Sequence, residues 1–181
     1  MAPIFATFFA VLILKESIKP IQWLFFAIAF GGVIVLRGFD ANLSTYGLVL
    51  VFFSAISSGL VYTIISKIGK QDHPVVIVNY FMLISAIFGG VLAINNWVWP
   101  MGKEWLLLFG LGCFGYFGQL YMTKAFQIAK TNQIAPFKYL EVLFTLSFGV
   151  VLFNDKYSLL SLLGICLIIT GLLLNVTYKK T

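Results

Sequence analysis

Charged side chains are scarce in this sequence. Only 10% of its 181 residues are charged, and only six residues are acidic, whereas soluble domains carry roughly 25% charged residues. Hydrophobic residues make up 61% of the chain, and a soluble protein of this size lacks the polar groups to cover so much apolar surface. The composition therefore excludes an ordinary soluble domain and predicts that lipid surrounds most of the chain.

Residues suited to catalysis or metal binding are also few. The sequence has one His and two Cys. Cys113 and Cys166 each lie within an apolar run, where a thiol packs as a small hydrophobic group, so neither a disulfide framework nor a metal site is predicted. No Ser-His-Asp set and no pair of carboxylates falls within one apolar run. We therefore expect neither an enzyme nor a bound cofactor.

The basic residues lie between the apolar runs, singly or in pairs, although the net charge is +6. That distribution is typical of membrane topology rather than of a surface that follows nucleic-acid phosphates. Lipid, and not nucleic acid, is therefore the predicted environment of the chain.

Continuous apolar runs predict seven membrane-spanning helices. Only helices and closed barrels satisfy the backbone in hydrocarbon, and runs of about 20 residues without two-residue alternation favour helices. The first run is shorter than the roughly 20 residues that cross a bilayer, so we expect further sequence upstream. The predicted spans are 2–14, 21–36, 46–66, 75–94, 106–128, 134–153 and 159–176.

Seven spans place the intervening loops on alternate sides of the membrane. Basic residues favour the cytoplasmic side, which predicts that the richer side, and with it the carboxyl end, is cytoplasmic. The richer side carries Lys15, Lys19, Lys67, Lys70, Lys130, Lys179 and Lys180, and the other side carries Arg37, Lys103 and Lys156.

An internal repeat relates the two ends of the chain. Moving residues 2–33 forward by 139 positions places Glu16 on Asp155 and Gly32 on Gly171. The first span then matches the sixth, and a displacement by an odd number of spans turns the copy upside down. Inverted repeats are a recurrent plan of secondary transporters.

The repeat predicts an all-α, polytopic, inverted-repeat helical bundle with seven transmembrane segments of an expected ten. Residues 1–37 would be the last two helices of a first unit, residues 38–45 a loop, and residues 46–181 a complete five-helix unit with a short tail.

Two stretches also resemble a known family. Residues 2–16 (APIFATFFAVLILKE) and 125–141, the latter followed by Gly149, Asp155, Gly164 and Gly171, are similar to the signature regions of EamA-type members of the drug/metabolite transporter superfamily. The resemblance implies ten helices, termini that face inward and a central cavity between the two units. Asp155 stands where that family usually has Glu.

Lys138 and Glu141 form the only charge pair well inside a long span, three residues apart on one helical face. A charge at membrane depth costs several kcal/mol unless it is paired or faces water. Two interpretations stay open. The residues neutralise each other structurally, or Glu141 binds a coupling proton or cation while Lys138 contacts a carboxylate or phosphate.

Other polar residues extend this candidate site. Thr145 continues the Lys138 face, Tyr139 is expected at the membrane interface, and Gln119 and Tyr62 are candidates for opposite walls. Ser58 shares a helical face with Tyr62, either for helix packing or to line a cavity. The predicted substrate-binding or coupling residues are Lys138, Glu141, Tyr139, Thr145, Gln119, Tyr62 and Ser58.

Two further interpretations concern helix ends. Pro136 is read as an ordinary first-turn proline in preference to a break in the sixth span, and Glu16 and Asp155 as structural turn residues.

The sequence as a whole predicts a secondary transporter that moves small organic metabolites or drugs across the inner or plasma membrane by alternating access. It is expected either to be coupled to a gradient of a proton or another cation or to run as facilitated exchange, and a homodimer is one possible assembly. The alternative is a truncated membrane scaffold or interaction subunit that transports nothing.

Overall fold

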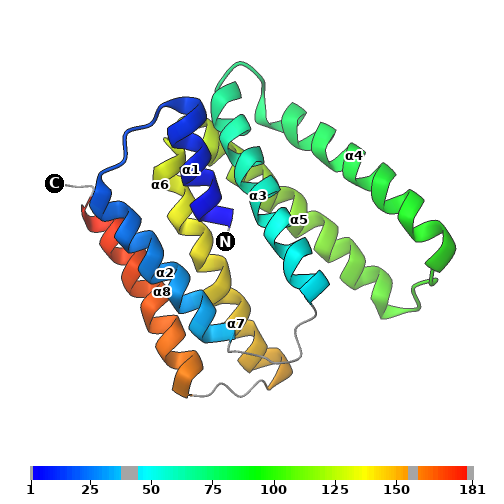
Figure 1. The fold of residues 1–181 in the computed structure, drawn as a ribbon. Coiled ribbons are helices and arrows are strands. Elements are labelled where there is room, and N and C mark those ends of the chain that lie inside the picture. Colours follow the sequence, from blue (N-terminus) through cyan, green and yellow to red (C-terminus); the bar gives the residue numbers. More distant parts are fainter. Residues whose placement is uncertain (1, 38–44, 155–158, 179–181) are drawn as a thin grey trace. The chain divides into compact units, whose positions relative to one another are not determined.

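The computed structural model describes residues 2–37, 45–154 and 159–178. Within these ranges every regular element is a helix and no strand occurs (Figure 1). The elements are α1 (Ala2–Leu14), α2 (Pro20–Arg37), α3 (Thr45–Ile68), α4 (Pro74–Ala93), η1 (Ile94–Asn96), α5 (Lys103–Ile128), α6 (Thr131–Ile134), η2 (Ala135–Tyr139), α7 (Leu140–Phe153) and α8 (Leu159–Thr177).

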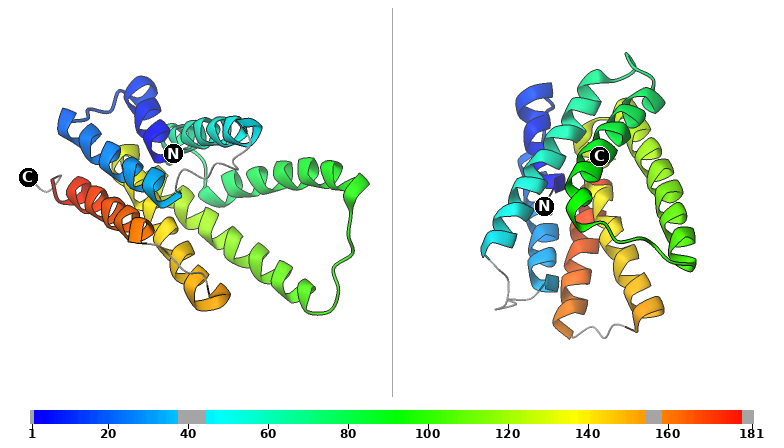
Figure 2. Two further views of the ribbon diagram at one scale, coloured as in Figure 1. Left: turned by 60° about the horizontal axis from the view of Figure 1, so that its bottom comes forward. Right: turned by 90° about the vertical axis from the view of Figure 1, so that its right-hand side faces the viewer.

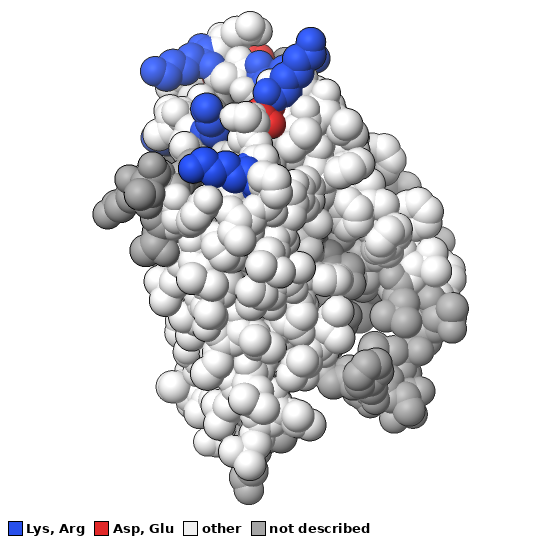
Figure 3. All heavy atoms as spheres, turned by 60° about the vertical axis from the view of Figure 1, so that its left-hand side comes forward, with Lys and Arg blue, Asp and Glu red and all other residues white. Residues whose placement is uncertain are grey.

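Four of the described helical segments are long and apolar enough to cross a bilayer: Val49–Ile68, Pro74–Ala93, Lys103–Ile128 and Thr131–Phe153. Three shorter apolar helices, Ala2–Leu14, Pro20–Val35 and Leu162–Asn175, account for the other predicted spans. On the face drawn in Figure 3, Lys and Arg side chains gather at one end, and uncharged side chains cover the described surface below them. The prediction of an all-α, polytopic membrane protein is confirmed.

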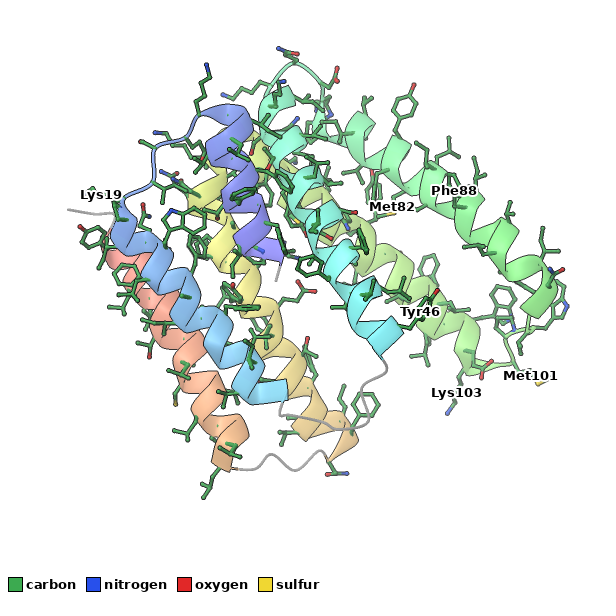
Figure 4. All side chains as sticks on the ribbon, in the orientation of Figure 1. Lys19, Tyr46, Met82, Phe88, Met101 and Lys103 are labelled. Atoms are coloured by element: carbon green, nitrogen blue, oxygen red, sulfur yellow. The ribbon has the colours of Figure 1, made fainter. Side chains whose placement is uncertain are left out.

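The described chain divides into two compact units. One consists of Met1–Ile64 with Ala129–Thr181, and the other is Ile65–Ile128. In the second unit, α4 and α5 form a hairpin joined by a hydrogen bond from the Tyr116 hydroxyl to Oδ1 of Asn79, at 3.2 Å. Figure 4 shows Met101 and Lys103 where the chain turns into α5. In the apolar 18-residue stretch of each of these helices, only 6% of the residues are buried within the structure. Both helices therefore have large exposed apolar faces.

The most extensive helix contact of the first unit joins α2 and α8, which lie side by side and run in opposite directions (Figures 1 and 2). Glycines allow the close approach. A Cβ on Gly32 would lie 2.6 Å from the carbonyl oxygen of Gly164 and 2.8 Å from the nitrogen of Ile168. Small residues of this kind let the backbones of packed membrane helices meet.

The α2–α8 contact is reciprocal. A Cβ on Gly171 would lie 2.7 Å from the carbonyl oxygen of Phe25 and 2.8 Å from the nitrogen of Ala29. Positions 32, 25 and 29 become 171, 164 and 168 when 139 is added, so the repeat maps this set of contacts onto itself. Two antiparallel helices with such a pattern are related by a local two-fold axis perpendicular to them, as an inverted repeat requires.

Helix α1 packs against α3 through an equally close contact. A Cβ on Gly59 would lie 2.6 Å from the backbone nitrogen of Ala6. The hydroxyl of Thr63 is buried 3.2 Å from the carbonyl oxygen of Ala6 and 3.0 Å from that of Gly59. A polar side chain therefore joins two apolar helices without an exposed polar group, which is the usual use of Thr between membrane helices.

A polar clasp connects the α1–α2 turn to the start of α6. The Glu16 carboxylate accepts the backbone N–H groups of Thr131, at 2.8 Å, and Asn132, at 3.0 Å. In return, the Asn132 amide donates to the carbonyl oxygen of Ser17 at 3.3 Å. Glu16 therefore accepts hydrogen bonds from N–H groups at a helix start, where the helix itself supplies no acceptor. It has the structural role expected from the sequence, and Asp155 lies outside the described residues.

Helices α1 and α7, which precede Glu16 and Asp155 in the sequence, end in the same way. Lys15, after α1, has φ of 54°, and Asn154, after α7, has φ of 56°. In the part of the chain that the structure describes, these are the non-glycine residues with positive φ, and they too are 139 positions apart. Left-handed residues commonly end helices, so this pair is a second local similarity between the repeats.

Pro136 is a first-turn proline, as expected, but of the 3-10 helix η2 and not of one continuous α-helix. The membrane segment begins at Thr131, not at position 134, and changes from α6 to the 3-10 helix η2 and then to α7. Pro136 lies in the first turn of η2. Because proline has no N–H and its ring clashes with the carbonyl four residues earlier, an α-helix that has already begun cannot continue regularly through it.

Candidate functional site

The candidate site is centred on an ion pair at the junction of η2 and α7. The Nζ atom of Lys138 lies 2.6 Å from Oε2 of Glu141. Lys138 is in the last turn of η2 and Glu141 in the first turn of α7, where the amino end of a helix favours a negative charge. The lysine side chain is 27% exposed and the glutamate side chain 66%. Both groups therefore remain accessible while paired.

A side chain from a different helix completes this cluster. The ammonium of Lys138 lies over the ring of Tyr62 on α3, at 5.8 Å from the ring centroid. At that distance the ring face attracts a cation. Ser58 is half-buried one turn earlier on α3. The first unit thus brings Lys138, Glu141 and Tyr62 together, from positions that are far apart in the sequence.

Other predicted site residues lie elsewhere or use their polar groups locally. The Thr145 hydroxyl donates to the backbone carbonyl of Glu141 at 2.8 Å, so it is engaged within its own helix. Gln119 is half-buried on α5, in the second unit.

The placement of Tyr139 at the membrane interface was wrong. Its side chain is only 3% exposed and packs with Phe26, Ala29 and Ile168. In the described part of the chain its hydroxyl has no hydrogen-bond partner. A 3-10 helix has three residues per turn, so neighbouring side chains are about 120° apart around its axis, and Tyr139 points into the core although the adjacent Lys138 does not.

A hollow of about 360 Å³ lies on α5, in the second unit. Its lining is apolar and contains none of the predicted site residues. The described residues also include no group of three or more His, Cys, Asp or Glu side chains that could hold a metal ion. The lining residues are Phe109, Gly112, Cys113, Tyr116 and Phe117.

Comparison with known protein families assigns the chain to one of them. The EamA-like transporter family matches residues 45–177, most of the sequence. The chain belongs to the EamA-like transporter family. This confirms the resemblance to EamA-type proteins of the drug/metabolite transporter superfamily, and it identifies the chain as an integral membrane protein. No solved structure matches this EamA-like chain.

Named relatives of this EamA-like chain are transporters. It is 25% identical to the pseudopaline exporter of Pseudomonas aeruginosa, over 99% of the chain and 64% of that protein. It is 26% identical to the S-adenosylmethionine uptake transporter of Rickettsia prowazekii, over 98% of the chain and 60% of that protein. It is 29% identical to the riboflavin transporter of Vibrio cholerae, over 84% of the chain and 52% of that protein. The chain spans less than two thirds of the length of these relatives.

Glu16 is the supporting residue that sequence reasoning did not connect with the site. Its carboxylate binds Thr131 and Asn132 at the start of α6, seven and six residues before Lys138 in the same membrane segment. Thr131 and Asn132 are 115 and 116 positions away from Glu16 in the sequence. No local sequence signal identifies such a contact, because a helix cap is normally recognised from residues next to it.

Proposed function

We propose that this protein is a secondary transporter that moves small organic metabolites across the inner or plasma membrane by alternating access. The observation that carries the proposal is the accessible Lys138–Glu141 pair on a membrane-spanning segment of an EamA-like chain. Ionisable groups at membrane depth are costly and mark substrate or ion pathways. Lys138 and Glu141 are proposed to contact the substrate or a coupling cation, with Tyr62 and Ser58 beside them.

The reciprocal packing of α2 and α8 supports this mechanism. Inverted repeats can exchange conformations and so open one site alternately to each side. We assign residues 1–37 to the end of a first repeat and residues 46–181 to a second, in support of which Gly32 and Gly171 make equivalent contacts. The repeat relation supports transport in general and does not indicate its direction, because inverted repeats can serve either import or export.

The named relatives agree with a small-molecule substrate but differ in substrate and direction. They include a pseudopaline exporter, an S-adenosylmethionine uptake transporter and a riboflavin transporter. The carboxyl end is proposed to be cytoplasmic from the distribution of basic residues. A coupling proton and a homodimer remain predictions.

Transport by the full chain in proteoliposomes tests the proposal. Radiolabelled S-adenosylmethionine, riboflavin and pseudopaline serve as the first solutes, and Glu141→Gln is expected to abolish or uncouple their movement. Ser147→Ala is the matched control, since Ser147 is an exposed α7 residue whose hydroxyl donates within its own helix, to the Leu143 carbonyl oxygen at 2.9 Å. Uptake that is unchanged in Glu141→Gln would contradict the assignment of this residue.

A further inference from the structure

We propose that the turn between α4 and α5 is a surface that binds phospholipid headgroups and fixes the depth of this hairpin in the bilayer. Three of the four tryptophans of the chain, Trp97, Trp99 and Trp105, lie in this turn. We call residues 97–105 the tryptophan turn. The inference concerns how the hairpin lies in the membrane, and it does not depend on the proposed transport function.

The apolar side chains of the tryptophan turn are exposed. Trp97, Trp99 and Trp105 are between 54% and 70% exposed, and Val98 and Met101 are exposed still further. A soluble monomeric protein rarely leaves so many large apolar side chains together in water. A phase that suits apolar groups therefore covers this turn.

The tryptophan turn has a defined backbone conformation. The Met101 N–H donates to Oε2 of Glu104 at 2.7 Å, and the Glu104 N–H donates to the Met101 carbonyl oxygen at 3.0 Å. Gly102, between them, has φ of 49°, a left-handed conformation that glycine adopts without strain. The rings of Trp97 and Trp99 meet edge to face, with their centroids 5.9 Å apart. The turn thus presents its indoles as a defined surface.

The lengths of the two helices place the turn at the edge of the hydrocarbon. Both helices are apolar enough to cross a membrane. With 20 residues in α4 and 26 in α5, a rise of about 1.5 Å per residue gives lengths of about 30 Å and about 39 Å. The hydrocarbon core of a bilayer is about 30 Å thick. When α4 crosses this core, the turn begins just beyond it, and α5 is long enough to extend with Trp105 into the headgroup layer.

The opposite end of the hairpin is polar instead of aromatic. Lys70, Asp72 and His73 are exposed there, before the start of α4, and the Gln127 side chain of α5 donates to the Asp72 carbonyl oxygen at 2.9 Å. Charged groups of this kind stay in water, whereas indoles prefer the headgroup layer. A shift of the hairpin along the membrane normal would move one of its two ends into an unfavourable layer, so its depth is fixed.

The polar atoms of the tryptophan turn suit phospholipid headgroups. Each indole offers one N–H donor and no acceptor, and the exposed ammonium of Lys103 lies in the same turn (Figure 4). The Glu104 carboxylate already accepts the Met101 N–H. The surface therefore presents apolar ring faces to the ends of the acyl chains and donors to the phosphodiester oxygens. Lipid is favoured over a protein partner because the turn joins two helices that can cross a membrane.

Depth-dependent quenching of tryptophan fluorescence in phosphatidylcholine vesicles tests the inference. A Trp23→Phe, Trp97→Phe, Trp105→Phe variant of the full chain keeps Trp99 alone. One quencher is phosphatidylcholine with a nitroxide on its headgroup, and a second is phosphatidylcholine brominated in the middle of its acyl chains. The matched control replaces all four tryptophans by Phe and carries Ile84→Trp, because Ile84 is 52% exposed near the middle of α4.

We expect the headgroup nitroxide to remove most of the Trp99 fluorescence and the acyl-chain bromines to remove much less. The order should be reversed in the Ile84→Trp control. The wild-type chain provides a second measurement that no substitution can disturb. Since three of its four tryptophans lie in the turn, the headgroup nitroxide should remove most of its fluorescence as well.

Three results would overturn the inference. Stronger quenching of Trp99 by the acyl-chain bromines than by the headgroup nitroxide would place the turn within the hydrocarbon. Quenching by aqueous iodide but by neither lipid would place the turn in water. Protection of Trp99 from all three quenchers, with the Ile84→Trp control still quenched by the bromines, would show that protein covers the turn, as in contact with a second copy of the chain.

Discussion

Gly32 and Gly171 each face backbone atoms of the opposite helix at the α2–α8 contact, and the two contacts are equivalent under the 139-residue repeat. The relation connects a sequence pattern to a physical requirement. A side chain larger than hydrogen at either position would meet the opposing backbone and could not be accommodated by a rotamer change. Both glycines are therefore required by packing, and the two positions should respond alike to substitution.

Gly32→Ala and Gly171→Ala should each destabilise the protein by about 1–3 kcal/mol, the usual penalty for overpacking. The added Cβ would lie 2.6 Å and 2.7 Å, respectively, from a carbonyl oxygen of the opposite helix, so α2 and α8 would have to separate. The apparent melting temperature in detergent measures the effect. Gly31→Ala is the control, because nothing lies within 4 Å of a Cβ at that position. Helix propensity alone would make Gly31→Ala stabilising, so an equal loss in this control would show that the α2–α8 contact does not determine the result.

Glu16→Ala should expose the start of α6. The variant removes the acceptor of the Thr131 and Asn132 N–H groups, and loss of hydrogen bonds to a charged group typically costs about 1.5–3 kcal/mol. Amide hydrogen exchange should accelerate at these two residues and stay unchanged in α8.

Glu16→Gln is the informative companion, since its amide oxygen can still accept one hydrogen bond. Exchange at Thr131 and Asn132 should be intermediate in this variant. Wild-type exchange rates in Glu16→Ala would mean that the clasp does not persist in solution.

Replacement of both members of the ion pair should separate stability from function. A Lys138→Met, Glu141→Leu double variant leaves no unpaired charge, and replacement of an ion pair by apolar residues is often neutral or stabilising. We expect the melting temperature to be retained and transport to be lost. Each single apolar variant should be less stable than the double variant. Full transport by the double variant would support a purely structural pair, as in a membrane scaffold.

Tyr139→Phe should leave the protein as stable as the wild type or more so. The Tyr139 hydroxyl is buried and has no hydrogen-bond partner in the described structure, and an unsatisfied buried polar group costs about 1–3 kcal/mol. Tyr139→Ala, in contrast, should destabilise by about 3–5 kcal/mol, as expected when a buried aromatic ring is lost. Thermal unfolding of the two variants checks both values. Loss of transport by a stable Tyr139→Phe variant would show instead that the hydroxyl contacts the substrate.

The sequence predicted the features that depend on local composition or on simple spacing. Long apolar runs gave the membrane helices because hydrocarbon admits few other structures. The three-residue spacing of Lys138 and Glu141 predicted neighbouring side chains, and they form an ion pair even though Lys138 lies in a 3-10 turn. Gly32 and Gly171 were matched as a repeat, and they pack equivalently.

Features that depend on tertiary contacts were missed or misplaced. An aromatic residue near the end of an apolar run suits either the interface or the core, and only packing against α2 and α8 places Tyr139 in the core. The hydrogen bond between Glu16 and Asn132 could not be predicted from the sequence either, because the two residues are 116 positions apart. The position of Gln119 relative to the ion pair remains a prediction.

If the proposed transport function holds, the Glu16 clasp also affects the rate of the transport cycle. Three hydrogen bonds join the α1–α2 turn to the start of the segment that carries Lys138. If these segments separate when the site opens at this end, all three bonds must break once in every turnover and form again before the next. Their strength would then enter the activation free energy of that step, so a weaker clasp would give a faster opening and a shorter-lived closed state.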